Sequence, residues 1–227
     1  MPRDSISIDS RLSAIAQLCG TCTVLADIGS DHGRLGAYLL QRGLCERVKL
    51  TDISAPSLLK ARMLIARLGL ETQADFIVGD GAGALDSAPD VAVIAGMGGE
   101  TIAGIVERGR DRLGDARLVV QPNVDAPLLR AALSKCGYAI ADERIVRCDG
   151  RLYVIMAAVP GASDYSEFEL HVGPVLMMRR DPELFDYAGF RLRVARKAAA
   201  GMERAGVDAA ETRREIEIWE EVAGWQG

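Results

Sequence analysis

The sequence lacks any long apolar run. In 227 residues, no stretch approaches the roughly 18 uninterrupted apolar residues that a membrane-spanning helix requires. The opening residues 1–4 also lack the apolar segment of a secretory signal. We therefore expect a cytoplasmic protein that does not contact a membrane.

Cysteine and histidine are scarce, with five and two residues. An odd number of cysteines in a chain of this size favours free thiols in a reducing compartment. Cys19 and Cys22 have C-x-x-C spacing but precede an apolar run, whereas a redox motif follows a strand and opens a helix. A zinc site needs a second pair of ligands, and His32 and His171 stand alone. We expect structural thiols and no metal.

The chain has no excess of basic residues, since its formal net charge is −5. This balance argues mildly against a nucleic-acid partner, because binding to phosphates draws on lysine and arginine. Residues 187–204 are a local exception, with one acidic residue, Glu203, against five basic ones. These are Arg191, Arg193, Arg196, Lys197 and Arg204. They form either a solvated helix face or a local patch for RNA.

Internal repeats and low-complexity segments are also absent, and strand and helix patterns alternate along the chain. Short apolar runs predict buried parallel strands at 23–28, 48–51, 76–78, 91–95 and 118–120. Helical patterns occupy 9–19, 34–41, 55–68, 100–108 and 126–136, and a hairpin is expected at 138–146 and 152–159. This order predicts an α/β fold: a Rossmann-like, mostly parallel class I methyltransferase sheet with an antiparallel edge hairpin.

The composition changes at residues 160–163, where Pro, Gly and Ser suggest a linker. We expect residues 1–160 to form the Rossmann-like domain and residues 161–227 a helical, coiled-coil-like extension. In the extension, Gly206 is expected to end one helix and Asp208 to cap the next, with Glu211 three residues on.

The segment from Asp27 to Gly33 follows the first strong strand and is the most informative loop. Ligands of open α/β sheets bind at such positions, and Gly29 allows a close approach of the backbone. The loop lacks the G-x-G-x-x-G pattern, and Asp27 and Asp31 would repel a pyrophosphate. The same carboxylates attract the ammonium and sulfonium of S-adenosylmethionine. The simpler alternative is a tight turn with a capping aspartate.

Later strand ends supply further candidate cofactor contacts. Asp52, followed by Ile53, ends the second strand, where a carboxylate commonly binds ribose hydroxyls. Asp52 can equally belong to the N-terminal cap of the next helix. Asp80 and Gly81 end the third strand, where an acid can meet the adenine amino group.

The fourth and fifth strands end in segments suited to a planar substrate. Ala95, Gly96, Met97 and Gly98 form a glycine-rich turn, which permits a flat base to approach the cofactor. Gln121 and Asn123 offer amides that can donate and accept at a base edge. Taken singly, each segment is also compatible with ordinary turn chemistry.

Together these motifs resemble the bacterial tRNA (adenine(22)-N1)-methyltransferases over almost the whole chain. The resemblance rests on SRL at 10–12, ADIGSDH at 26–32, GDG at 79–81, IAGMGG at 94–99, QPN at 121–123, LYVI at 152–155 and GP at 173–174. It implies S-adenosyl-L-methionine as cofactor, tRNA as substrate and a C-terminal helical hairpin that helps to hold the tRNA. The expected oligomeric state is a monomer.

The resemblance and the loop chemistry assign the remaining roles. Gly96, Met97 and Gly98 would frame the base, and Asn123 or Gln121 would orient it. Asp31 would lie near the reacting centre or serve the cofactor alone. The cofactor set comprises Arg11, Asp27, Gly29, Ser30, His32, Asp52, Ile53, Asp80, Gly81, Ala95 and Gly96. Rival hypotheses are another RNA or small-molecule methyltransferase, a nicotinamide-dependent oxidoreductase and a non-catalytic RNA-binding module.

Overall fold

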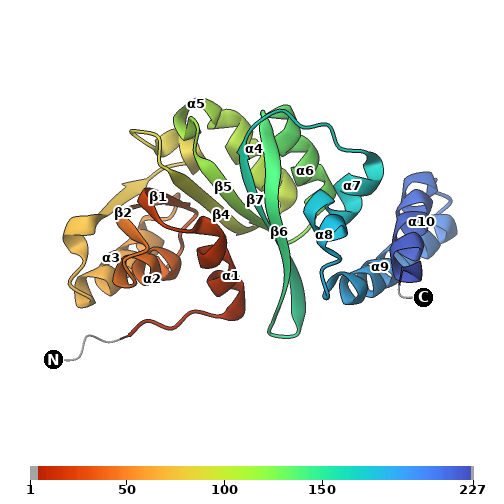
Figure 1. The fold of residues 1–227 in the computed structure, drawn as a ribbon, viewed down its shortest axis with the longest axis horizontal. Coiled ribbons are helices and arrows are strands. Elements are labelled where there is room, and N and C mark those ends of the chain that lie inside the picture. The colour runs from red at the N-terminus through yellow and green to blue at the C-terminus, as the bar shows by residue number, and fades with distance from the viewer. Residues whose placement is uncertain (1–4, 226–227) are drawn as a thin grey trace. The chain divides into compact units, whose positions relative to one another are not determined.

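The computed structural model describes residues 5–225 and divides into two compact units, Met1–Asp164 and Tyr165–Gly227. The first unit is built on a seven-stranded sheet with the order β3-β2-β1-β4-β5-β7-β6 (Figure 1). The strands are β1 (Cys22–Ile28), β2 (Cys45–Asp52), β3 (Ala74–Val78), β4 (Val91–Met97), β5 (Arg117–Pro122), β6 (Tyr138–Cys148) and β7 (Arg151–Pro160).

Strands β1 to β5 pair with one another in parallel, and β7 pairs with β5 and β6 in antiparallel orientation. The central strands read as continuous apolar runs because they are covered on both faces. Leu25, Val48, Val93 and Val119 are all fully buried. The predicted Rossmann-like sheet with its antiparallel edge hairpin is confirmed.

Helices cover the two faces of the sheet in separate groups. One group is α1 (Ser10–Cys19), α2 (Arg34–Gln41) and α3 (Ala55–Arg67); the other is α4 (Gly99–Arg108), α5 (Arg110–Leu113) and α6 (Ala126–Lys135). Side-chain hydrogen bonds cap the N-termini of two helices of the first group, α1 and α3. The Asp9 side chain accepts a hydrogen bond from the Leu12 amide over 2.8 Å, and the Ser54 hydroxyl accepts one from Ser57.

Short elements escape the sequence patterns. The two 3-10 turns η1 (Glu71–Gln73) and η2 (Gly81–Ala84), and the four-residue α5, are too short to show a period. The hairpin strands are also longer than expected, because β6 and β7 pair from Tyr138↔Pro160 to Cys148↔Arg151.

The second unit contains α7 (Glu167–Val172), α8 (Pro174–Arg179), α9 (Leu184–Arg204) and α10 (Ala210–Gly224). Helices α9 and α10 pack against each other, and Tyr187 meets the buried Trp219 edge-on at 5.5 Å. The predicted cap at Asp208 is displaced by one position: Ala209 is the N-cap of α10, and Asp208 accepts from the Ala210 amide. A capping box that the sequence analysis missed joins Ser166 and Glu169 in α7.

The boundary between the units lies at Asp164, four residues beyond the linker start expected from composition. Ser163 still belongs to the first unit, since its hydroxyl donates to the Tyr138 carbonyl and its own carbonyl accepts from Ser134 over 2.6 Å. Within residues 5–225, no helix is long and apolar enough to span a membrane. The same residues contain no cluster of His, Cys, Asp and Glu side chains fit for a metal ion.

All five cysteines are free. Cys19 ends α1 and Cys22 begins β1, so the pair does not open a helix as a redox motif does. Burial raises the pKa of Cys22 to about 11 and that of Cys45 to about 12. These thiols therefore remain protonated and weakly nucleophilic near neutral pH.

Candidate active site

A cavity of about 500 Å³ opens at the carboxyl ends of β1 and β4. The strand order reverses between these neighbours, and open α/β sheets bind ligands at such a reversal. Nine predicted site residues line the cavity: Arg11, Asp27, Gly29, Ser30, Asp31, His32, Ala95, Gly96 and Met97. Four further lining residues were not predicted: Asp9, Leu12, Arg34 and Leu35.

The loop after β1 is held against the end of β2 by backbone hydrogen bonds. The amides of Gly29 and Ser30 both donate to the Thr51 carbonyl, over 2.8 and 3.0 Å. Gly29 has φ +73°, and a Cβ there would overlap the terminal methyl of Met97. Asp31 adopts φ +48°, a region open to aspartate. The turn thus needs glycine at Gly29 and brings the backbone to the cavity wall.

Asp27 lies at the bottom of this turn, with only 7% of its surface exposed. Burial raises its pKa to about 7, and the charge of Asp52 acts in the same direction. A backbone hydrogen bond from Gly36, in the first turn of α2, partly offsets this rise. In the described part of the chain, no basic side chain forms an ion pair with Asp27. The cavity therefore holds a buried acid that a cation would stabilise as the carboxylate.

Asp31 and His32 lie at the exposed side of the cavity. The Asp31 carboxylate is 3.1 Å from His32 Nδ1, and His32 Nε2 is 3.1 Å from the Lys60 ammonium. Because a lysine ammonium can only donate, Nε2 acts as acceptor and Nδ1–H donates to Asp31. These contacts join His32 to Asp31 of the loop and to Lys60 of α3, and its contact with a cofactor stays a prediction.

Gln121 and Asn123 are not among the residues that line the cavity. Arg11 Nη1 donates to Gln121 Oε1 over 2.6 Å, and Gln121 Nε2 donates to Asn123 Oδ1 over 3.1 Å. Gln121 is completely buried. Its predicted contact with a base edge is wrong, because burial and these internal bonds withhold its amide from a substrate. Asn123 is exposed, and its contact with the base stays a prediction.

The remaining predicted residues lie outside the cavity lining. Asp52 braces the loop, since its carboxylate accepts from the amides of Asp31 (3.0 Å) and Ser54 (2.8 Å). Asp80 is exposed and lies 3.7 Å from Arg108, next to Gly81 at the start of η2. Ile53 is 75% exposed. Gly98 is the N-cap of α4. The roles of these residues in binding stay predictions.

The unpredicted lining residues come from helix starts beside the loop. Asp9 and Leu12 belong to the first turn of α1 and its cap, and Arg34 and Leu35 begin α2. The helical periods at 9–19 and 34–41 predicted these helices. Which of their residues face the loop depends on how the two helices pack against the sheet.

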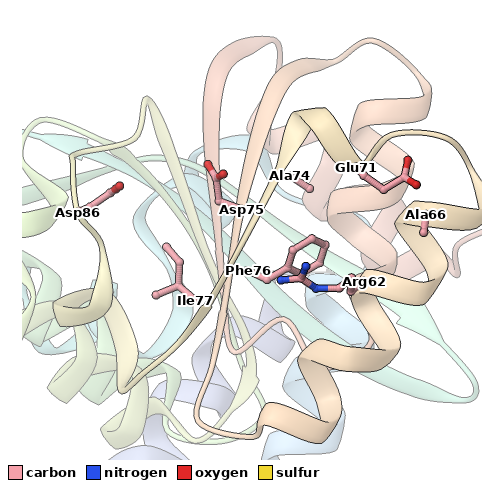
Figure 2. A pocket seen from close by; sticks show the side chains of 8 residues that line it. All are labelled: Arg62, Ala66, Glu71, Ala74, Asp75, Phe76, Ile77 and Asp86. Atoms are coloured by element: carbon pink, nitrogen blue, oxygen red, sulfur yellow. The ribbon is translucent and has the colours of Figure 1, made fainter.

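A second cavity, also of about 500 Å³, lies along the edge strand β3. Figure 2 shows Arg62 over the ring of Phe76, 4.7 Å from its centroid. Asp75 accepts from Arg47 through both oxygens at 3.1 Å, and Asp86 pairs with Lys49. Both aspartates are therefore already paired with basic side chains of the protein. The cavity at β1 and β4 differs because its buried acid, Asp27, forms no ion pair with any residue of 5–225.

Comparisons with known proteins agree with this geometry. Residues 8–156 match the family model described as "Methyltransferase domain". The tRNA (adenine(22)-N(1))-methyltransferase of Bacillus subtilis (strain 168) is 34% identical over 174 residues, which cover 75% of this chain and 73% of that protein. The chain belongs to this methyltransferase family.

Solved structures extend the similarity over both units. The structure of the B. subtilis M1A22 tRNA methyltransferase TrmK, a family member, has a TM-score of 0.85 at 27% identity, covering 96% of this chain and 99% of that one. Sp1610 of Streptococcus pneumoniae, crystallised in complex with S-adenosyl-L-methionine, has a TM-score of 0.82 at 27% identity. That match covers 94% of this chain and 98% of the other.

Proposed function

We propose that this protein transfers a methyl group from S-adenosyl-L-methionine to N1 of adenine 22 in tRNA. The observation that carries the proposal is the cavity between β1 and β4, with a buried aspartate that has no cationic partner in the described chain. The family relationship supports the same activity, since the B. subtilis relative is a tRNA (adenine(22)-N(1))-methyltransferase.

The cavity fits the amino-acid part of S-adenosyl-L-methionine. Asp27 would pair with the ammonium, and the guanidinium groups of Arg11 and Arg34 line the same cavity, where they can meet the carboxylate. The Ser30 hydroxyl is buried without a hydrogen-bond partner among the described residues. A ligand that supplies this partner would remove the cost of burying it.

The adenosine part would extend from the cavity along the ends of β2 and β3. Each Asp52 oxygen accepts one backbone amide, so each keeps a lone pair for a ribose hydroxyl. Ile53 offers an exposed apolar surface for the adenine ring. Asp80 would accept from the adenine amino group, and the neighbouring Gly81 has φ +61°, a conformation that favours glycine.

When bound, the cofactor supplies a methyl group on a positively charged sulfur. Adenine N1 has its own lone pair, so the protein need not remove a proton before transfer. The chain must hold N1 about 3 Å from the methyl carbon, in line with the sulfur. Gly96, Met97 and Gly98 would frame the base there. The exposed Asp31 carboxylate would stabilise the positive charge that develops on the ring.

We further propose that the protein works as a monomer in the cytoplasm. The first unit would bind the cofactor, and the helical extension after it would bind tRNA. Light scattering during size-exclusion chromatography would measure the mass, and a dimer would contradict this part of the proposal.

Incubation with labelled S-adenosyl-L-methionine and an unmodified tRNA transcript tests the reaction. We expect label in the tRNA and a primer-extension stop at adenine 22, with neither in a transcript that carries guanine there. Label at another position would assign a different RNA site. Failure to bind S-adenosyl-L-methionine together with tight binding of a nicotinamide dinucleotide would favour the oxidoreductase instead.

A further inference from the structure

A line of three hydrogen bonds crosses the first unit from α1 to the loop at the end of β4. Arg11 Nη1 donates to Gln121 Oε1 over 2.6 Å, and Gln121 Nε2 donates to Asn123 Oδ1 over 3.1 Å. Asn123 Nδ2 then donates to the Gly96 carbonyl over 2.7 Å. Both ends of the line, Arg11 and Gly96, line the cavity.

Each end of this line requires the same direction of donation. A guanidinium can only donate, so Gln121 must present Oε1 to Arg11 and its NH₂ to Asn123. A carbonyl can only accept, so Asn123 must present its NH₂ to Gly96. Gln121 is completely buried, so its amide is not exposed to bulk solvent. The orientation of the Asn123 amide is therefore fixed by chemistry at both ends.

Two further contacts hold the ends of the line in place. The Arg11 guanidinium carbon lies 5.6 Å from the centroid of the Tyr153 ring, a cation–π distance. The backbone N–H of Asn123 donates to the Met97 carbonyl over 2.7 Å, which fixes the main chain at Asn123 and therefore the base of its side chain.

The exposed amide of Asn123 keeps one hydrogen on Nδ2 and one lone pair on Oδ1 beyond those used in the line. This donor beside an acceptor matches the N7 acceptor and N6 amino donor of adenine, the pairing that asparagine makes with this base. Guanine presents two acceptors, O6 and N7, and would oppose Oδ1. Recognition through N6 and N7 leaves N1 free to receive the methyl group.

We infer that Asn123 reads the N6/N7 edge of the target adenine, and that Arg11 and Gln121 are positioning residues that fix its amide. The inference rests on the proposed function and adds the edge of the base that is recognised. It predicts that loss of N7 from the substrate and loss of the Asn123 amide from the protein are not additive.

Substituting one atom of the target base tests the contact. Wild-type protein at saturating cofactor would be compared on a ligated tRNA with adenine at position 22 and on one with 7-deazaadenine there, which lacks the N7 acceptor. We expect kcat/KM to fall by about tenfold on the second tRNA, the usual effect of leaving one donor unpaired. In Asn123→Ala the two tRNAs should react at nearly equal rates, and that ratio also measures any difference in ring reactivity.

Gln121→Glu tests the positioning role, because glutamate accepts from Arg11 but cannot donate to Asn123. We expect Gln121→Glu to lose the preference for adenine over 7-deazaadenine. We expect Gln121→Asn to lose this preference as well. Gln17→Glu is the matched control: Gln17 Oε1 also accepts from an arginine, Arg144, over 2.6 Å, but it lies on the exposed side of α1. This control should keep the wild-type preference.

Each outcome separates the inference from the function on which it rests. A wild-type protein that methylates both tRNAs equally would overturn the reading of N7 while leaving the methyltransferase intact. A Gln121→Glu variant with the wild-type preference would overturn the positioning role. Absence of methylation of either tRNA by the wild type would remove the proposed function, and the inference with it.

Discussion

At the scale of single residues, Asp27 links the burial of one carboxyl group to ligand binding. Its pKa is raised to about 7 mainly by burial, so near neutral pH much of the protein without ligand carries Asp27 protonated. A cationic ligand binds the carboxylate better than the acid. Binding of S-adenosyl-L-methionine should therefore release protons and depend on pH.

We expect the affinity for S-adenosyl-L-methionine to rise with pH up to about 7 and then to level off. Between pH 8 and pH 6 the dissociation constant should increase by about tenfold, because only the ionised fraction binds. Asp27→Asn should bind more weakly and show little dependence on pH. Isothermal titration calorimetry across this range provides the measurement, and an unchanged pH profile in the variant would remove Asp27 from the site.

The same carboxyl group affects stability in the opposite sense. Its pKa in the folded protein lies above the 3.8 of an unperturbed aspartate, so the folded state binds the proton more tightly than the unfolded chain. Stability from this group is present at low pH and is lost as pH rises from about 4 through about 7. Burial of Asp27 thus favours binding of a cationic ligand but lowers the stability of the folded protein near neutral pH.

At the scale of one element, the start of α4 is fixed by close contact with the segment before α6. The Gly99 amide donates to the Val124 carbonyl over 3.0 Å. A Cβ on Gly99 would overlap the Asp125 carbonyl oxygen and lie 2.9 Å from that of Val124. This contact holds the Gly96–Gly98 turn next to the cavity.

Gly99→Ala should destabilise the protein by about 1–3 kcal/mol, because the added methyl group meets backbone that cannot move aside. Gly104→Ala in the middle of the same helix is the matched control. Its Cβ would approach only the end of the flexible Arg108 side chain, so this variant should gain about 0.5–1 kcal/mol from the helix preference of alanine. Urea denaturation of both variants distinguishes the two effects, and equal stabilities would contradict them.

At the scale of the whole molecule, the net charge of −5 requires that tRNA bind to a local surface. Helix α9 offers one. Arg191 and Arg196 are neutralised by Glu215 and Glu220 of α10. Arg193, Lys197 and Arg204 are exposed and form no ion pair in the described structure. Their spacing of four and seven residues places them on one side of the helix.

Reversing the charges of Arg193, Lys197 and Arg204 together should weaken tRNA binding and lower its salt dependence by about 2–3 in the slope of log K against log salt. Cofactor binding should be unaffected. The double exchange Arg196→Glu with Glu220→Arg is the control, because it keeps an existing ion pair and leaves the three free cations in place. Fluorescence anisotropy at several salt concentrations measures both, and an unchanged slope in the triple variant would exclude this surface.

Local patterns in the sequence predict the order of the elements and the loop that lines the cavity. The periodic spacing of apolar residues indicates strands and helices from short stretches of sequence. The glycines and aspartates of 27–33 likewise indicate a tight acidic turn. These signals depend on residues close in the chain, which is why β1 to β5 and the loop after β1 could be predicted.

The partners and the burial of each polar side chain follow from tertiary packing. Gln121 accepts a hydrogen bond from Arg11, 110 positions away in the sequence, and is completely buried. Of the two loop acids, Asp27 became buried and Asp31 stayed exposed. Arg191 and Arg196 form ion pairs with glutamates of α10. Burial and pairing depend on partners that fold from distant segments, and no local pattern in the sequence records them.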